Sequence, residues 1–142
     1  MIDTSRQAVA DTGFIVALTN TNDTAHVSAR QNFIRFEQIF LPQSTLTEIL
    51  FLIRRDAGTA TVINFLDSLY RSRLKLTCLN DQDIKRTTQL LKQYQDSRID
   101  FVDASVMAMA ERLEIRNILT LDRRDFSLVR PAKWDYFELY PW

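Results

Sequence analysis

The chain has 142 residues, 46% of them hydrophobic, with two glycines and three prolines. This size and composition predict one globular domain, residues 1–142, with a full hydrophobic core. Lys plus Arg and Asp plus Glu both number 18, so the formal net charge is zero and a basic surface for nucleic acid must be local. The single cysteine excludes an internal disulfide framework. No apolar run approaches the ~18 residues of a membrane span, and the polar start lacks a signal-peptide core, so we expect a cytoplasmic protein with no membrane partner.

Apolar runs between turn-forming residues predict strands that alternate with helices in the first half of the chain. A buried strand is expected to end at Asp11, followed by a turn at Gly13 and a short helix over 14–18. The next elements expected are a helix over 25–37, a strand over 39–41, a helix capped by Ser44 or Thr45 that ends near Gly58, and a helix over 59–71.

The second half continues the alternation. The pattern predicts a strand over 74–79, a helix from Asn80 or Asp81 to about Tyr94, a helix within 99–113, and strands over 117–121 and 136–139. Such an order is typical of an α/β fold of three layers, in which helices flank a mostly parallel sheet of about five strands. Ligands of such sheets bind outside the carboxyl ends of the strands, so that edge is where a site is expected.

The helix within 99–113 carries a carboxylate in an apolar setting. Asp103 lies beside the stripe formed by Val102, Val106, Met109, Ala110 and Leu113, with no cation among its helical neighbours. An unpaired buried charge costs several kcal/mol, so this carboxylate needs a partner. A structural role is the alternative, with Asp100 as the N-cap and Asp103 in the first turn.

Other acids also fall where predicted strands end or where the following helices begin. Asp11 closes the first strand, Glu48 lies in the first turn of the helix after the second strand, and Asp122 closes the strand over 117–121 with Asp125 three residues later. In a parallel sheet these acids gather with Asp100 and Asp103 on one rim, where like charges repel unless a cation is present.

Each of these acids also has a purely structural interpretation. Thr45 and Glu48 fit a capping box, Asp122 fits the cap of a short helix, and Asp11 fits an Asx turn. Their common position at one edge favours a site. Carboxylates without a His or Cys cluster select Mg²⁺ or Mn²⁺. An open acidic metal site suits phosphodiester hydrolysis by a nuclease or a phosphatase, and the acids alone do not separate the two.

Two other enzyme classes fit the residues less well. Asp11-Thr12-Gly13 matches an aspartic protease signature, but that fold is all-β and turn-rich, whereas this chain is rich in predicted helices. A phosphatase with a nucleophilic aspartate needs a second acid where Gly13 stands. Such a phosphatase, like a receiver domain, also needs a lysine after a later strand, and that lysine is missing.

Four short motifs, in order along nearly the whole chain, resemble PIN domains, and most closely the VapC-like toxins of bacterial type II toxin–antitoxin systems. The motifs are Ala10-Asp11-Thr12, Thr47-Glu48, Asp100-x-x-Asp103-Ala104 and Leu119-Thr120-Leu121-Asp122-x-x-Asp125-Phe126. The resemblance implies a PIN fold and a Mg²⁺- or Mn²⁺-dependent endoribonuclease that cleaves single-stranded RNA.

The resemblance also implies roles for individual residues. The implied catalytic residues are the core acids Asp11, Glu48 and Asp103, with Asp122 at the fourth acid position and Thr120 orienting a water. The implied metal ligands are Asp11, Glu48, Asp100, Asp103, Asp122 and Asp125. A hydroxyl such as that of Thr12 commonly sits near the metal in the family.

Three arginines could supply the phosphate contacts that net charge does not: Arg98, Arg123 and Arg124. The toxin resemblance implies a homodimer and a small antitoxin bound in an apolar groove, for which the helix faces with Phe14, Leu18, Phe51 and Leu52 are candidates. Two alternatives remain open: a PIN-like module that binds a partner without catalysis, and a PIN nuclease of RNA processing without an antitoxin.

Overall fold

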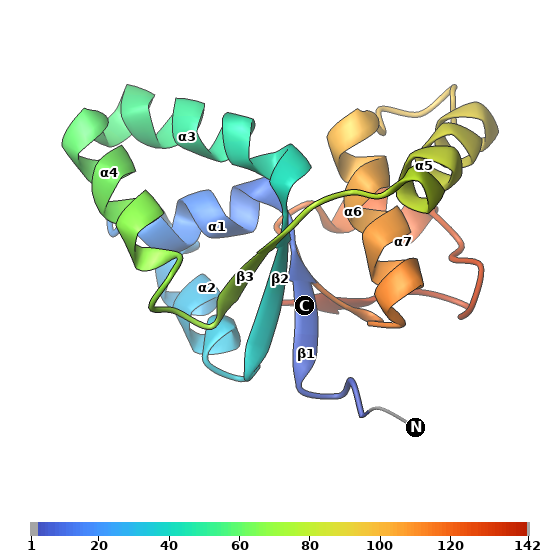
Figure 1. The fold of residues 1–142 in the computed structure, drawn as a ribbon, viewed down its shortest axis with the longest axis horizontal. Coiled ribbons are helices and arrows are strands. Elements are labelled where there is room, and N and C mark those ends of the chain that lie inside the picture. Colours follow the sequence, from blue (N-terminus) through green and yellow to red (C-terminus); the bar gives the residue numbers. More distant parts are fainter. Residues whose placement is uncertain (1–2, 142) are drawn as a thin grey trace.

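A computed structural model of the protein describes residues 3–141. At its centre lies a sheet of five parallel strands in the order β3-β2-β1-β4-β5 (Figure 1). The strands are β1 (Gln7–Ala10), β2 (Gln38–Pro42), β3 (Leu74–Thr77), β4 (Asn117–Leu119) and β5 (Glu138–Tyr140). The expected parallel α/β sheet flanked by helices is therefore confirmed.

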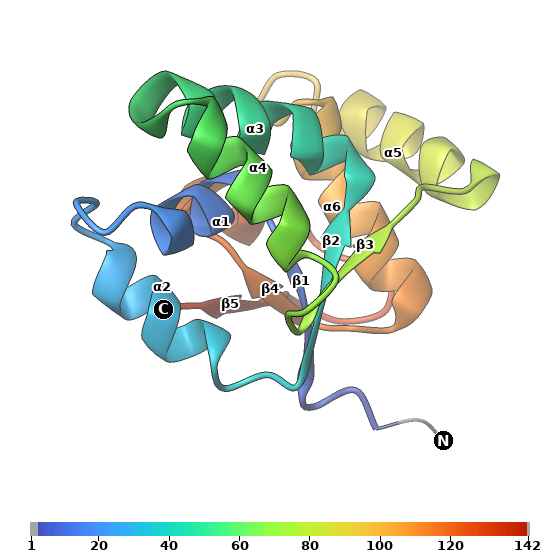
Figure 2. The same cartoon turned by 60° about the vertical axis from the view of Figure 1, so that its left-hand side comes forward.

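Helices connect the strands and cover both faces of the sheet. They are α1 (Thr12–Thr19), α2 (His26–Phe33), α3 (Gln43–Ala57), α4 (Thr59–Ser68), α5 (Asp81–Gln93), α6 (Phe101–Leu113) and α7 (Arg123–Leu128). Figure 1 shows α1 to α4 on one side of the sheet and α5 to α7 on the other. Helix α3 packs against α1 and α4, and α1 packs against α2 (Figure 2). Within residues 3–141, no helix combines the length and apolar character that a bilayer span needs.

The alternation of side chains along β1 divides the core in two. Ala8 and Ala10 belong to the cluster beneath α1 to α4, whereas Val9 between them belongs to the cluster beneath α5 to α7. All three are fully buried, as expected for a central strand covered on both faces. The short side chains of Ala8 and Ala10 leave room for Phe14 of α1, which is also fully buried in the same cluster.

The order of the strands places a switch point beside β1. From β1 the chain moves outward to β2 and β3, then returns across the sheet to place β4 on the other side of β1. The strand order therefore reverses between β1 and β4, so the carboxyl ends of these two strands border the crevice in which such sheets bind ligands. Ala10 pairs with Leu119 across the strands, which sets Asp11 beside Thr120 at this end.

Several element boundaries differ from the sequence prediction. Helix α2 ends at Phe33 rather than residue 37, and β4 ends at Leu119 rather than residue 121. The predicted turn at Gly13 is wrong, since Gly13 lies within α1. Ser44 and Thr45 do not cap α3, which already begins at Gln43. Thr45 instead donates its hydroxyl to the Pro42 carbonyl at 2.7 Å, because a buried hydroxyl within a first turn finds its nearest free acceptor three residues back.

Candidate active site

Asp11 and Thr120 occupy the switch point between β1 and β4. Asp11 is 6% exposed and Thr120 is fully buried. The Thr120 hydroxyl donates to Asp11 Oδ2 at 3.2 Å and accepts the backbone N–H of Asp122 at 2.9 Å. Asp11 stands at the N-cap position of α1 but makes no side-chain cap hydrogen bond. The Thr120 hydroxyl, directly after β4, therefore holds the Asp11 carboxylate, which does not cap α1.

The start of α6 brings two more acids to this edge. Asp100 and Asp103 form a reciprocal capping box: Asp100 Oδ1 accepts the Asp103 N–H at 3.0 Å, and Asp103 Oδ2 accepts the Asp100 N–H at 3.2 Å. The structural interpretation of this pair is thus confirmed. It does not exclude a second role, because each carboxylate uses one oxygen for the cap and has another lone-pair-bearing oxygen.

Glu48 reaches the same region from α3. The predicted capping box with Thr45 is absent from the described residues, and Glu48 Oε1 instead accepts the hydroxyl of Thr12 at 3.3 Å. Thr12 is the first residue of α1, directly after Asp11. This contact therefore joins an exposed acid of α3 to the end of the strand that carries the buried acid.

Asp122 and Asp125 complete the rim after β4. Asp122 caps α7 by accepting the Asp125 N–H at 3.0 Å. Asp125 is 6% exposed and lies 3.9 Å from the Arg98 guanidinium. Burial and the neighbouring Asp122 raise the pKa of Asp125, and the charges of Arg98 and Arg124 oppose that rise. Two of the three predicted phosphate-binding arginines, Arg98 and Arg124, therefore lie close enough to Asp125 to lower its pKa.

Burial and mutual repulsion dominate the electrostatics of the cluster. Burial raises the pKa of Asp11 to about 6, with added repulsion from Asp122 and Glu48. Burial and the charge of Asp11 raise the pKa of Asp103 to about 8. These shifts mean that Glu48, Asp103 and Asp122 each lie close enough to Asp11 to repel it, at the edge where the sequence predicted them. A bound cation would relieve that repulsion.

The acids are near one another without forming a closed coordination shell. Among residues 3–141 no three His, Cys, Asp or Glu side chains are grouped so that they could hold a metal ion as they stand. The donor set nevertheless has the chemistry that Mg²⁺ or Mn²⁺ prefers, namely carboxylate and hydroxyl oxygens. The raised pKa values of Asp11 and Asp103 also show negative charge that neighbouring cations leave uncompensated.

Comparison with known proteins decides the family. The PIN domain family profile matches residues 8–130, a span that runs from β1 past α7. The chain belongs to the PIN domain family. Ribonuclease VapC26 of Mycobacterium tuberculosis is 25% identical to it over 134 residues, which cover 94% of this chain and 99% of that protein.

Solved structures show that this PIN domain shares its fold with VapC proteins. VapC20 of M. tuberculosis, described as a Sarcin-Ricin loop cleaving toxin, has a TM-score of 0.70 at 20% identity and covers 78% of this chain and 86% of that chain. VapBC2 from Rickettsia felis, bound to a promoter DNA fragment, has a TM-score of 0.70 at 15% identity. The match covers 96% of this chain and 98% of that chain.

An apolar hollow adjoins the acids of this PIN domain. A space of about 350 Å³ is lined by Thr12, Thr47, Glu48, Phe51 and Leu52. Phe51 is 65% exposed, so the expectation that Phe51 and Leu52 face a groove is consistent with the structure. The same expectation is wrong for Phe14, which is fully buried because its side chain fills the core beneath α1.

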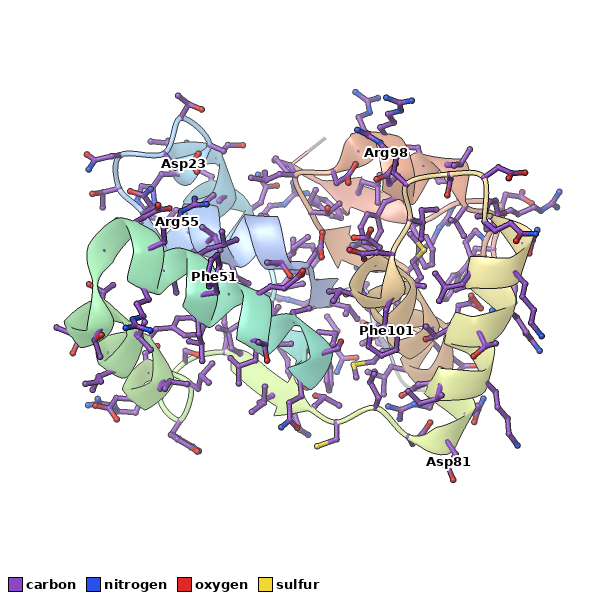
Figure 3. The ribbon with its side chains drawn as sticks, turned by 90° about the horizontal axis from the view of Figure 1, so that it is seen from above. Asp23, Phe51, Arg55, Asp81, Arg98 and Phe101 are labelled. Carbon is purple, nitrogen blue, oxygen red and sulfur yellow. The ribbon has the colours of Figure 1, made fainter. Side chains whose placement is uncertain are left out.

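Sequence reasoning missed three residues at this edge, which the tertiary structure brings into view. Ser44 of α3 and Ser105 of α6 lie 2.7 Å apart between their hydroxyl oxygens. Phe101, the first residue of α6, is 47% exposed. Figure 3, seen from above, shows Phe51 on α3 and Phe101 on α6 on opposite sides of the region between these helices. An aromatic residue directly after Asp100 was the one signal visible in the sequence.

Proposed function

We propose that the protein is a Mg²⁺- or Mn²⁺-dependent endoribonuclease that hydrolyses single-stranded RNA, and that it is the toxin of a toxin–antitoxin pair. The observation that supports this most strongly is the set of mutually repelling carboxylates at the switch point of the sheet, because it leaves negative charge for a cation to neutralise. The similarity to Ribonuclease VapC26 supports the same substrate class.

Asp11, Glu48, Asp103 and Asp122 would hold the metal, with Asp100 and Asp125 at the edge of the set. When bound, such an ion activates a water and neutralises the scissile phosphate. Thr120 holds the Asp11 carboxylate in place through its hydrogen bond at 3.2 Å and is the residue we assign to orient the attacking water.

The RNA backbone would be bound by the arginines beside α7. Arg98 is largely exposed although it reaches Asp125, and Arg123 and Arg124 occupy the first turn of α7. Guanidinium groups there could contact phosphates next to the acids without a strongly basic surface elsewhere. Such contacts position the strand and carry no sequence information.

The hollow at Phe51 and Leu52 is the surface we assign to the antitoxin. It is mainly apolar and opens beside Glu48, so a segment bound there could cover the acids. The likeness to the R. felis VapBC2 structure and to a toxin–antitoxin complex from Klebsiella pneumoniae supports an antitoxin partner. We extend the proposal to a homodimer, which the family resemblance implies.

Cleavage of single-stranded RNA by the purified protein tests the function. We expect cleavage with Mg²⁺ or Mn²⁺, none with EDTA, and none with Asp103→Asn, because that change removes a charge at constant size. Asp67→Asn is the matched control, since Asp67 is an exposed acid on α4, in a different part of the fold. This control should cleave as the unaltered protein does.

Three results would contradict all or part of the proposal. Cleavage that persists in both EDTA and Asp103→Asn would show that the activity does not come from this site. A protein that neither cleaves RNA nor binds Mn²⁺ in calorimetry would instead be a PIN module that binds a partner without catalysis. Metal-dependent cleavage by a chain with no antitoxin encoded beside it would favour a nuclease of RNA processing.

A further inference from the structure

Phe101 is an exposed aromatic residue for which the fold has no evident use. It opens α6 and is 47% exposed. The residues that pack the start of this helix are instead Ile99 and Ala104, the positions of a hydrophobic staple, which are 8% and 0% exposed. Phe101 belongs to neither core cluster. Its ring is therefore not used by the core and is available to a ligand.

Phe101 lies in the first turn of α6, the helix whose capping box holds Asp100 and Asp103. Asp103, two residues later, projects from another face of the helix, so the ring is related to the site through α3. Ser105, one turn further along the same face of α6, hydrogen-bonds to Ser44 of α3. Phe101 therefore lies on the face of α6 that meets α3, the helix that carries Glu48 (Figure 3).

The surroundings of Phe101 favour a nucleobase over an apolar peptide. The residues just before it in the chain are charged and exposed: they include Asp100 and Arg98, whose side chain is 67% exposed. Phe51 differs, since it lines an apolar hollow together with Leu52. A planar base attached to an anionic backbone matches an isolated ring in a segment that also carries an exposed arginine, because aromatic stacking needs only one flat face.

We propose that Phe101 is a substrate-positioning residue on which an unpaired base next to the scissile phosphate stacks. The inference rests on the proposed ribonuclease function and adds a contact that selects single strands, because a paired base has no free face to offer. Stacking would hold the neighbouring phosphate over the acids while Arg98 contacts the backbone.

Binding of RNA to an uncleaving protein tests this contact. In the Asp103→Asn background, fluorescence anisotropy would give the affinity for eight-nucleotide single-stranded RNAs of mixed sequence, with 2-aminopurine placed at each position in turn. We expect Phe101→Ala to weaken binding on the order of tenfold. It should also abolish the quenching of 2-aminopurine at one position. Phe101→Trp should retain both signals, whereas Phe101→Leu should resemble Phe101→Ala.

Tyr70→Ala is the matched control, because Tyr70 is an aromatic residue that is 90% exposed near the end of α4. It should leave both signals unchanged. Affinity unaltered by Phe101→Ala would overturn the stacking role and leave the ribonuclease proposal intact. Full affinity in Phe101→Leu would also overturn it, since an apolar contact would then suffice. If no RNA binds the background protein and the unaltered chain cleaves none, both proposals fail together.

Discussion

At the scale of single residues, Thr120 links two strand ends through one hydroxyl group. Its oxygen accepts a hydrogen bond from the Asp122 N–H, and its O–H donates one to the Asp11 carboxylate. Both partners lie at the candidate site, and Thr120 is fully buried. The side chain therefore helps to hold both the Asp11 carboxylate and the backbone that leads into α7.

Thr120→Val would remove this hydroxyl at nearly constant volume. The Asp122 N–H would lose its acceptor and the buried Asp11 would lose a donor, so we expect the free energy of unfolding to fall by about 1–3 kcal/mol. Urea denaturation measures this change, and the conservative Thr120→Ser should restore most of it. Equal stability of the Val and Ser variants would contradict the assigned role.

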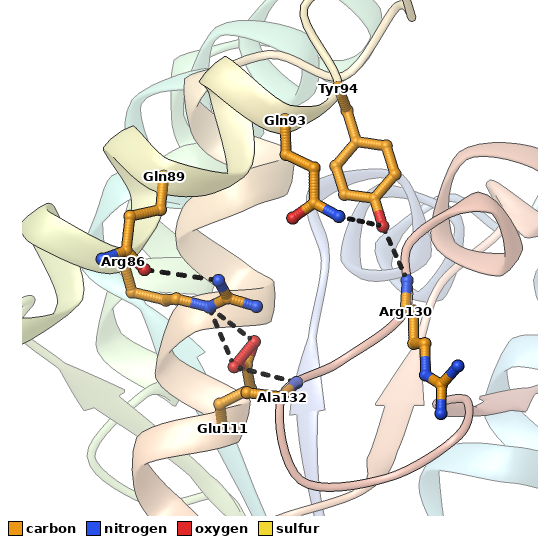
Figure 4. Close-up of polar contacts among 7 residues, drawn as sticks. All are labelled: Arg86, Gln89, Gln93, Tyr94, Glu111, Arg130 and Ala132. Atoms are coloured by element: carbon orange, nitrogen blue, oxygen red, sulfur yellow. Dashed lines mark hydrogen bonds and ion pairs between the residues drawn. The ribbon is translucent and has the colours of Figure 1, made fainter.

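At the scale of elements, α6 is held at both ends. Toward its end, Glu111 accepts the Nε–H of Arg86 on α5 at 3.0 Å and the backbone N–H of Ala132 at 3.4 Å (Figure 4). Near its start, Ser105 donates its one hydrogen to the Val102 carbonyl at 2.7 Å. Ser44 must then donate to Ser105, and this hydrogen bond ties α6 to the beginning of α3.

Ser44→Ala tests whether this link sets the separation of Glu48 and Asp103. We expect a small loss of stability, about 0.5–1.5 kcal/mol. We also expect a higher Mn²⁺ concentration for half-maximal RNA cleavage, because the acids would be less well placed. Ser44→Thr should restore the metal requirement. Ser68→Ala removes a hydrogen bond within α4 and is the control; if it shifts the metal requirement as far, the link has no special role.

At the scale of the whole molecule, the candidate site joins the two helical layers. Asp11 directly follows the central strand, Glu48 comes from the layer of α1 to α4, and Asp103 comes from the layer of α5 to α7. A cation bound by all three would bridge both layers and bind only the folded chain. Its binding should therefore stabilise the fold.

The pH dependence of thermal stability tests this idea without any substrate. Asp103 has a pKa of about 8 in the folded protein, against 3.8 ordinarily, so between these values the folded chain holds a proton that the unfolded chain has lost. In EDTA, Tm should fall as pH rises through this range. Asp103→Asn should remove much of the slope, and Asp67→Asn should not.

Mn²⁺ should raise Tm more at pH 8 than at pH 5, since ionised carboxylates bind cations and protonated ones do not. Differential scanning fluorimetry across this range, with and without the metal, measures both effects. A Tm in EDTA that rises steadily to pH 8, with no response to Mn²⁺, would contradict an uncompensated acidic cluster.

The order and type of the elements could be predicted because hydrophobic period and turn residues are local properties. The strand before Asp11 and the helix after Asn80 were placed within a residue or two of their observed bounds. The end of β4 could not be predicted, because pairing with β1 and β5 ends at Leu119 while the apolar pattern of the sequence continues to Leu121. Gly13 has no local signal for helix and is helical because α1 packs on α3.

The sequence by itself determined the parallel α/β class and the acids at its carboxyl edge, because strand ends and helix starts follow from patterns a few residues long. Only the tertiary structure decided which oxygen each acid shares with a neighbour, that Phe14 is core while Phe51 and Phe101 face solvent, and that Ser44 meets Ser105. Those outcomes depend on contacts between segments far apart in the chain, which no local pattern contains.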